Sequence, residues 1–210
     1  MTIVIDFESN KAGELFILGY RHQDEFQQII LDGRLEGLTQ HEPYILNYMA
    51  PSDAAKMIVK KAKNLGVSVA GYTMVDKTIL EDQLGNADFD YVNLHSIAKK
   101  WINKNFYREF RDQEDPPDWS LKSVSEFFGY PAERDYARGQ TTARINSIIN
   151  GLKAKKGIYT NLTRVQKTKA TKLLKHNEFD VNAASLILQV QKTSRDPQSV
   201  ISAMREQAQK

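Results

Sequence analysis

The first 33 residues of the chain contain three apolar runs separated by short polar breaks. The runs read TIVIDFES, LFILGYRH and FQQIILDG. Breaks of only a few residues are typical of hairpin turns between neighbouring strands. The pattern therefore predicts a three-stranded antiparallel meander at the start of the chain.

After this meander the spacing of apolar residues alternates between the periods of helices and strands. We expect a helix at 52–66, a strand at 67–73, a helix at 75–85, and a short strand leading into a helix at 88–104. Ser52 or Asp53 is expected to cap the first helix, and Gly66 to end it. A strand, a helix and a second strand in this order give parallel neighbours. The fold class is therefore α/β, with a mixed sheet of antiparallel and parallel strands flanked by helices.

The remainder of the chain is expected to be mostly helical. A charged loop containing Pro116 and Pro117 comes first, and SLKSVSEFFGY then reads as a short capped helix. Longer helices are expected at about 136–153 and from about 161 onward. We expect one domain over residues 1–193 and a weakly held helical tail over 194–210.

Composition narrows the class of protein. A chain of 210 residues with 41% hydrophobic residues can bury one sizeable core. It has no cysteine, which excludes disulfides and thiolate metal sites and suits a reducing cytoplasm, the location that we expect. No apolar run approaches the roughly 20 residues that a membrane span needs. We therefore expect no membrane contact, and we also expect a monomer.

The distribution of charge is more informative than the net charge of +3. No acidic residue lies between Tyr136 and Asn177, a window rich in lysine and arginine. Such a window is either a solvated helix face or a surface that attracts the phosphates of a nucleic acid. The residues expected to bind nucleic acid are Arg144, Lys153, Lys155, Lys156, Lys167 and Lys172.

Two carboxylates, Asp6 and Glu8, interrupt the first apolar run. Side chains alternate along a strand, so these two point to the same side, about 7 Å apart. Burial penalises each charge, and the two charges repel each other. A shared proton, a basic partner or a metal ion is needed to offset that cost, unless the pair faces solvent on an edge strand.

Three segments in order carry a resemblance to a known family. VIDFES holds Asp-x-Glu on a strand, VAGYTMVDKTIL runs from a strand into Asp76, and LLKHNEFDVNAASLI contains Asp180. WSLKSVSEFFGY lies between the second and third segments. Together they resemble the DEDD, or DnaQ-like, 3′–5′ exonuclease superfamily, and the branch with the proofreading domains of family B polymerases is most similar. The resemblance covers about residues 2–189 and implies a ribonuclease H-like fold.

The chain departs from this pattern at two blocks. Thr73 and Val75 stand where the second block usually has an Asn and an aromatic residue ahead of its Asp. His176 stands four residues before the last Asp, where this branch has Tyr. The other main branch has His, but five residues before its Asp.

Two site residues have plainer alternatives. His176 can be read as a surface residue of a basic helix. Asp76 can be read as the N-cap of its helix, because N-caps are frequently Asp. In that case the acids that could replace it in the site are Asp82, Asp88 and Asp90.

The resemblance implies a metal-dependent phosphodiester hydrolase that uses two Mg²⁺ or Mn²⁺ ions. The implied ligands are Asp6, Glu8, Asp76 and Asp180, which suit hard cations that prefer carboxylate oxygen. His176 and Asp180 are four residues apart, so they share one face of a helix. An unperturbed imidazole has a pKa near 6.5, so His176 is the expected general base.

The expected substrates are the 3′ ends of single-stranded DNA or RNA, and a replication or repair protein is a further expected partner. Two other functions fit the same sequence. One is an inactive nucleic-acid-binding module that keeps the fold. The other is a docking subunit of a replication or repair assembly, with the C-terminal helices as its contact surface.

Overall fold

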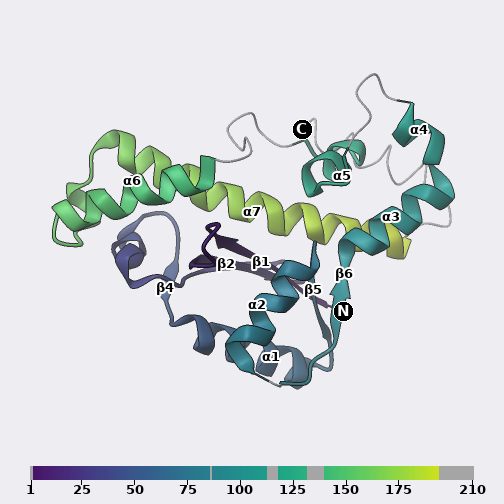
Figure 1. Ribbon diagram of the computed structural model, residues 1–210, viewed down its shortest axis with the longest axis horizontal. Coiled ribbons are helices and arrows are strands. Elements are labelled where there is room, and N and C mark those ends of the chain that lie inside the picture. The colour runs from purple at the N-terminus through teal and green to yellow at the C-terminus, as the bar shows by residue number, and fades with distance from the viewer. Residues whose placement is uncertain (1, 86, 113–117, 132–139, 194–210) are drawn as a thin grey trace.

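The computed structural model describes residues 2–85, 87–112, 118–131 and 140–193, which form a six-stranded mixed sheet flanked by helices (Figure 1). The strands are β1 (Thr2–Ser9), β2 (Leu15–His22), β3 (Glu25–Ile30), β4 (Leu46–Tyr48), β5 (Ser68–Gly71) and β6 (Tyr91–Asn93). Their order across the sheet is β4-β3-β2-β1-β5-β6. The strands β1, β2 and β3 pair antiparallel, and β5 and β6 run parallel to β1. The predicted α/β class, meander and parallel strands are confirmed.

The helices occupy most of the positions that the sequence predicts. They are α1 (Pro51–Leu65), α2 (Met74–Leu84), α3 (Leu94–Asn105), α4 (Tyr107–Arg111), α5 (Leu121–Phe127), α6 (Gln140–Ala154) and α7 (Arg164–Thr193), with 3-10 segments η1 (Gly33–Gln40) and η3 (Tyr159–Asn161). The sequence did not predict η1 or β4, and α4 lies in a segment expected to be a loop. The expected tail at 194–210 lies outside the described residues, as do residues 113–117 of the expected loop and residues 136–139 of the helix expected at 136–153.

The start of α1 differs from the prediction. Its N-cap is Ala50, which makes no side-chain cap, and Pro51 occupies the first turn. Neither Ser52 nor Asp53 is the cap, because proline already fixes the backbone angle that a first helical residue needs. Gly66 closes the helix with a left-handed φ of 63°, as predicted.

The two faces of β1 pack against different layers. Ile3, Ile5 and Phe7 pack in one core cluster with residues of α1, whereas Val4 packs with residues of α7. Figure 1 shows α1 and α2 on one side of the sheet and the long α7 across the other. Because side chains alternate along a strand, Asp6 and Glu8 share the face of Val4 and point toward α7.

The neighbour strand β5 is shorter than β1. It pairs with β1 only from Thr2 to Val4. The last residues of β5 and β6 are paired with each other, so both strands end at the same level. Asp6 and Glu8 therefore lie on the part of β1 that extends beyond β5. No helix in the described ranges is both long enough and apolar enough to cross a membrane.

Candidate active site

Four acids predicted from three separate sequence blocks influence one another's pKa in the structure. Asp6 and Glu8 lie on β1, Asp76 on the first turn of α2, and Asp180 on α7. Burial, followed by repulsion from Asp180, Glu8 and Asp76, raises the pKa of Asp6 well above its usual range. We call these four residues the acid cluster. The alternative of a solvent-facing pair on an edge strand is wrong, because β1 is a central strand and Glu8 is only 7% exposed.

The other three members also hold protons more tightly than free carboxyl groups do. Burial and the charges of Asp180 and Asp76 raise the pKa of Glu8 to about 8. Burial and the charge of Asp76 raise the pKa of Asp180 to about 7. Burial raises the pKa of Asp76 to about 6, although backbone N–H groups that donate to its carboxylate lower it in part. The cluster is electrostatically costly when ionised, and a cation would relieve that cost.

Asp76 reaches the cluster because Thr73, and not Asp76, is the N-cap of α2. The Thr73 side chain accepts a hydrogen bond from the N–H of Val75 at 3.2 Å. Asp76 is buried, and its Oδ1 accepts a hydrogen bond from the N–H of Phe7 at 3.2 Å. The acids considered as replacements are exposed, and none of them is among the charges that raise the pKa of Asp6: Asp82, Asp88 and Asp90.

His176 lies beside two members of the acid cluster. Its Nε2 is 3.8 Å from Oε1 of Glu8 and 3.4 Å from Oδ2 of Asp180. One ligand atom from each of these three residues lies within 4.8 Å of the other two, close enough to share one metal ion. Within the described part of the chain, the buried Oε1 of Glu8 has no hydrogen-bond partner. A buried carboxylate oxygen of this kind is costly unless a ligand meets it.

The environment of His176 differs from that of a free imidazole. Burial, together with the positive charge of Arg144, lowers the pKa of His176 to about 4, below the 6.5 expected from the sequence. The ring is therefore neutral at pH 7, as a general base requires. It is also a weaker proton acceptor than the sequence suggested, because the buried surroundings disfavour its charged form. The alternative of an exposed surface histidine is wrong, since its side chain is only 19% exposed.

Arg144 was expected to bind nucleic acid together with the lysines, but the structure separates it from them. It is 6% exposed, and its guanidinium donates to Oε1 of Gln140 at 2.8 Å. Its charge lowers the pKa of both Glu8 and His176, so it lies close to the acid cluster. Lys153 lies nine residues further along α6, roughly 14 Å away along the helix axis.

The predicted lysines divide into two groups. Lys153, Lys155 and Lys156 are exposed at the end of α6 and just beyond it. Lys167 is only partly exposed, because its Nζ donates to the carbonyl of Thr160 at 2.7 Å. Lys172 is also partly buried. The three exposed lysines fit the predicted basic surface. Lys167 and Lys172 are less accessible to a nucleic acid, because the fold partly covers them.

Asn177 was missed by the sequence analysis. It is fully buried, and its Nδ2 donates to Oδ2 of Asp6 at 2.8 Å and to the carbonyl of Asp6 at 3.2 Å. An Asn between His176 and Asp180 carries no signal of its own. Gly19 within an apolar strand was the available signal, because a strand glycine often marks the close approach of another group.

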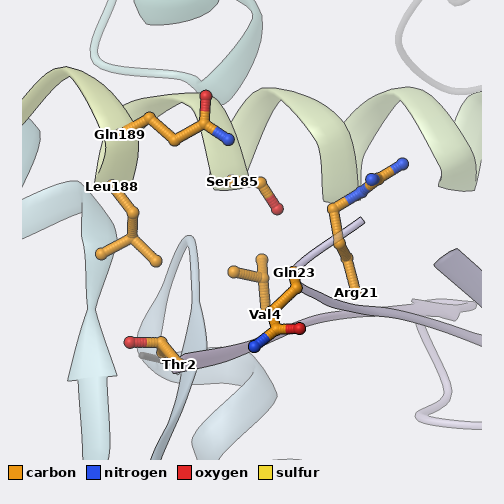
Figure 2. A pocket seen from close by; sticks show the side chains of 7 residues that line it. All are labelled: Thr2, Val4, Arg21, Gln23, Ser185, Leu188 and Gln189. Atoms are coloured by element: carbon orange, nitrogen blue, oxygen red, sulfur yellow. The ribbon is translucent and has the colours of Figure 1, made fainter. Parts of the chain in front are cut away.

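Two cavities open beside the sheet. One, of about 610 Å³, lies at the start of α2, where Thr73 and Met74 line it together with Tyr72, His95 and Trp119. The other, of about 160 Å³, lies between β1 and α7 beside Val4, Arg21 and Ser185 (Figure 2). None of the predicted site residues lines either cavity.

Comparison with known proteins does not place this chain in a family. No protein-family model matches this sequence, and no curated protein matches it.

Proposed function

We propose that this protein is a metal-dependent 3′–5′ exonuclease that hydrolyses phosphodiester bonds of single-stranded DNA or RNA. The observation that carries the proposal is the acid cluster, in which β1, α2 and α7 bring four carboxylates together at one end of the sheet. Buried acids that raise one another's pKa are costly without a cation. Such a cost is retained where it serves a function.

The donors fit hard divalent cations. Carboxylate oxygens predominate, no cysteine is present, and one neutral imidazole lies beside them. Asp6, Glu8, Asp76 and Asp180 would hold two Mg²⁺ or Mn²⁺ ions. When bound, the two ions would supply an activated water and stabilise the leaving 3′ oxygen.

The residues around the acid cluster would perform the remaining tasks. His176, which is neutral at pH 7, would accept a hydrogen bond from the attacking water and orient it. Arg144 would offset negative charge on the scissile phosphate, because its guanidinium lies near Glu8 and His176. The cavity beside α2 would receive the sugar and base of the terminal nucleotide.

The fold is compatible with the family that the sequence resembles. Its sheet of three antiparallel strands followed by parallel β5 and β6 fits a ribonuclease H-like fold. We therefore assign the chain, as part of the proposal, to the DEDD superfamily near the proofreading branch. The 3′–5′ polarity comes from that resemblance.

The proposal is tested with 5′-labelled linear DNA and RNA and with a circular single strand, each in Mg²⁺ and in Mn²⁺. A ladder that shortens from the 3′ end, with the circle intact, supports the proposal. Cutting of the circle would indicate an endonuclease. If the protein bound the strands and cut none of them, the inactive binding module would be the better description.

A further inference from the structure

The side chains that neighbour Asp6 across the sheet form a row with a gap. Asp6 on β1 pairs with Gly19 on β2, and Gly19 pairs with Gln28 on β3. Residues paired in this way lie side by side on one face of the sheet. Because Gly19 has no side chain, the row is open between the carboxylate of Asp6 and the amide of Gln28.

Asn177 of α7 fills this gap and bonds to both sides of it. Its Nδ2 donates to Oδ2 of Asp6 at 2.8 Å, and its Oδ1 accepts from Nε2 of Gln28 at 2.9 Å. A Cβ at Gly19 would lie 2.2 Å from Oδ1 of Asn177, so any other residue there would displace the amide. The glycine and the asparagine are therefore complementary parts of one arrangement.

The hydrogen bonds also determine which way the Asn177 amide faces. Its nitrogen also donates to the backbone carbonyl of Asp6 at 3.2 Å. A carbonyl oxygen only accepts hydrogen bonds, so the Asn177 nitrogen must face Asp6. Gln28 keeps it there, since its Nε2 donates both to Asn177 and to the carbonyl of Leu174 at 2.9 Å. Both amides are buried, where an unmade hydrogen bond is costly.

We propose that Asn177 is a positioning residue, oriented by Gln28, that fixes the plane of the Asp6 carboxylate for binding a divalent cation. This inference rests on the proposed function. The bond to Oδ2 uses one of the lone-pair sites of the carboxylate and leaves others for a metal. Partners that orient a ligand from behind typically change metal affinity by about 10- to 100-fold when they are removed.

The test is Asn177→Leu, which keeps a similar volume and removes the amide. Isothermal titration with Mn²⁺ should give a dissociation constant raised about 10-fold or more. On a 5′-labelled strand, kcat at a fixed, subsaturating Mn²⁺ concentration should fall by a similar factor, with little change in KM. Raising the Mn²⁺ concentration should restore part of kcat, which loss of folded protein would not allow.

Two further variants separate positioning from folding. Gln28→Leu leaves Asn177 in place without its orienting donor, so it should weaken Mn²⁺ binding by a smaller factor. Leu38→Ala, a cavity in the buried core at η1, should lower the Tm and leave the Mn²⁺ dissociation constant unchanged. If Asn177→Leu does not fold, the Mn²⁺ dissociation constants of Gln28→Leu and Leu38→Ala are compared instead. A weaker affinity in Gln28→Leu alone supports the positioning role, and equal affinities overturn it.

The outcomes distinguish this inference from the function on which it rests. If the wild-type protein neither binds Mn²⁺ nor cuts a strand, the proposed function and the inference both fail. If the wild type does both, and the folded Asn177 and Gln28 variants bind Mn²⁺ as tightly as it does, only the positioning role is overturned.

Discussion

The backbone N–H of Phe7 donates to Oδ1 of Asp76 at 3.2 Å, which joins the start of α2 to β1 between its two acids. The bond forms because β1 extends beyond β5, whose pairing with β1 stops at Val4. A backbone N–H at that point needs a partner, and the carboxylate of Asp76 supplies one. Because β1 is longer than its neighbour β5, Asp76 can bond to the free part of β1 and lie beside Asp6 and Glu8.

Removing one charge from the acid cluster should separate activity from stability. In Glu8→Gln we expect cleavage to be lost. At pH 8 or above, where much of Glu8 is ionised in the wild type, the metal-free variant should melt at the same temperature as the wild type or higher, because a repelling buried charge is gone. Mn²⁺ should raise the wild-type Tm by mass action and leave the variant's Tm unchanged. Glu36→Gln, at an exposed position, is the matched control. Wild-type cleavage in Glu8→Gln would remove this residue from the mechanism.

The raised pKa values predict how stability depends on pH. Between about pH 4, where free carboxyl groups titrate, and pH 8, the pKa of Glu8, the folded state binds more protons than the unfolded chain. The free energy of unfolding of the metal-free protein should therefore fall as the pH rises through this range. Each kcal/mol lost lowers the Tm by about 2–4 °C for a chain of this size.

Mn²⁺ should change this dependence, because the acids must lose their protons before they bind a metal. We expect the Tm increase caused by Mn²⁺ to be small at pH 5 and larger at pH 8. Differential scanning calorimetry in EDTA and in Mn²⁺ measures both effects. A metal-free Tm that rises from pH 5 to pH 8 would contradict the predicted sign.

His176 should affect turnover more than metal binding. In His176→Ala we expect kcat to fall on the order of 10²-fold, the usual scale for a general base, while the stabilisation by Mn²⁺ remains. Because the pKa of His176 is about 4, its removal should not change the shape of the pH–rate profile between pH 6 and 8. His176→Tyr should recover part of the rate.

Lys175→Ala, an exposed neighbour on the same helix, is the control for His176. Wild-type turnover in His176→Ala would show that the attacking water needs no help from this residue. Loss of the Mn²⁺ effect on Tm would show instead that His176 is itself a ligand.

The exposed lysines should contribute to binding and not to chemistry. Replacing Lys153, Lys155 and Lys156 with Glu should weaken binding of a single-stranded oligonucleotide most at low salt and flatten the salt dependence, because phosphate contacts release counterions. Turnover at saturating substrate should change little. Fluorescence anisotropy at several salt concentrations measures the effect. The same change at Lys56, Lys60 and Lys63 of α1, across the sheet, is the control, and equal losses in both variants would show a general charge effect only.

Local features of the sequence were enough for much of the fold. The hairpin breaks, the helix stop at Gly66 and the alternation along β1 follow from interactions between near neighbours in the chain. The acids could be predicted as well, because carboxylates within an apolar run are rare and contrast with their surroundings. The predicted cap of α1 was wrong, because the helix begins with Pro51, whose ring fixes the backbone angle, and not with a side chain that caps it.

What the sequence by itself determined is that Asp6 and Glu8 share one face of a buried strand, and that His176 and Asp180 share one face of a helix. Only the tertiary structure decided that these faces meet, that Arg144 is buried close to the acid cluster and apart from the surface lysines, and that Asn177 fills the space above Gly19. These contacts join residues far apart in the chain, and they depend on strand register and on how α7 docks. Neither is fixed by local periodicity, because the same helix face could pack on the sheet at several positions until the side chains of both are placed together.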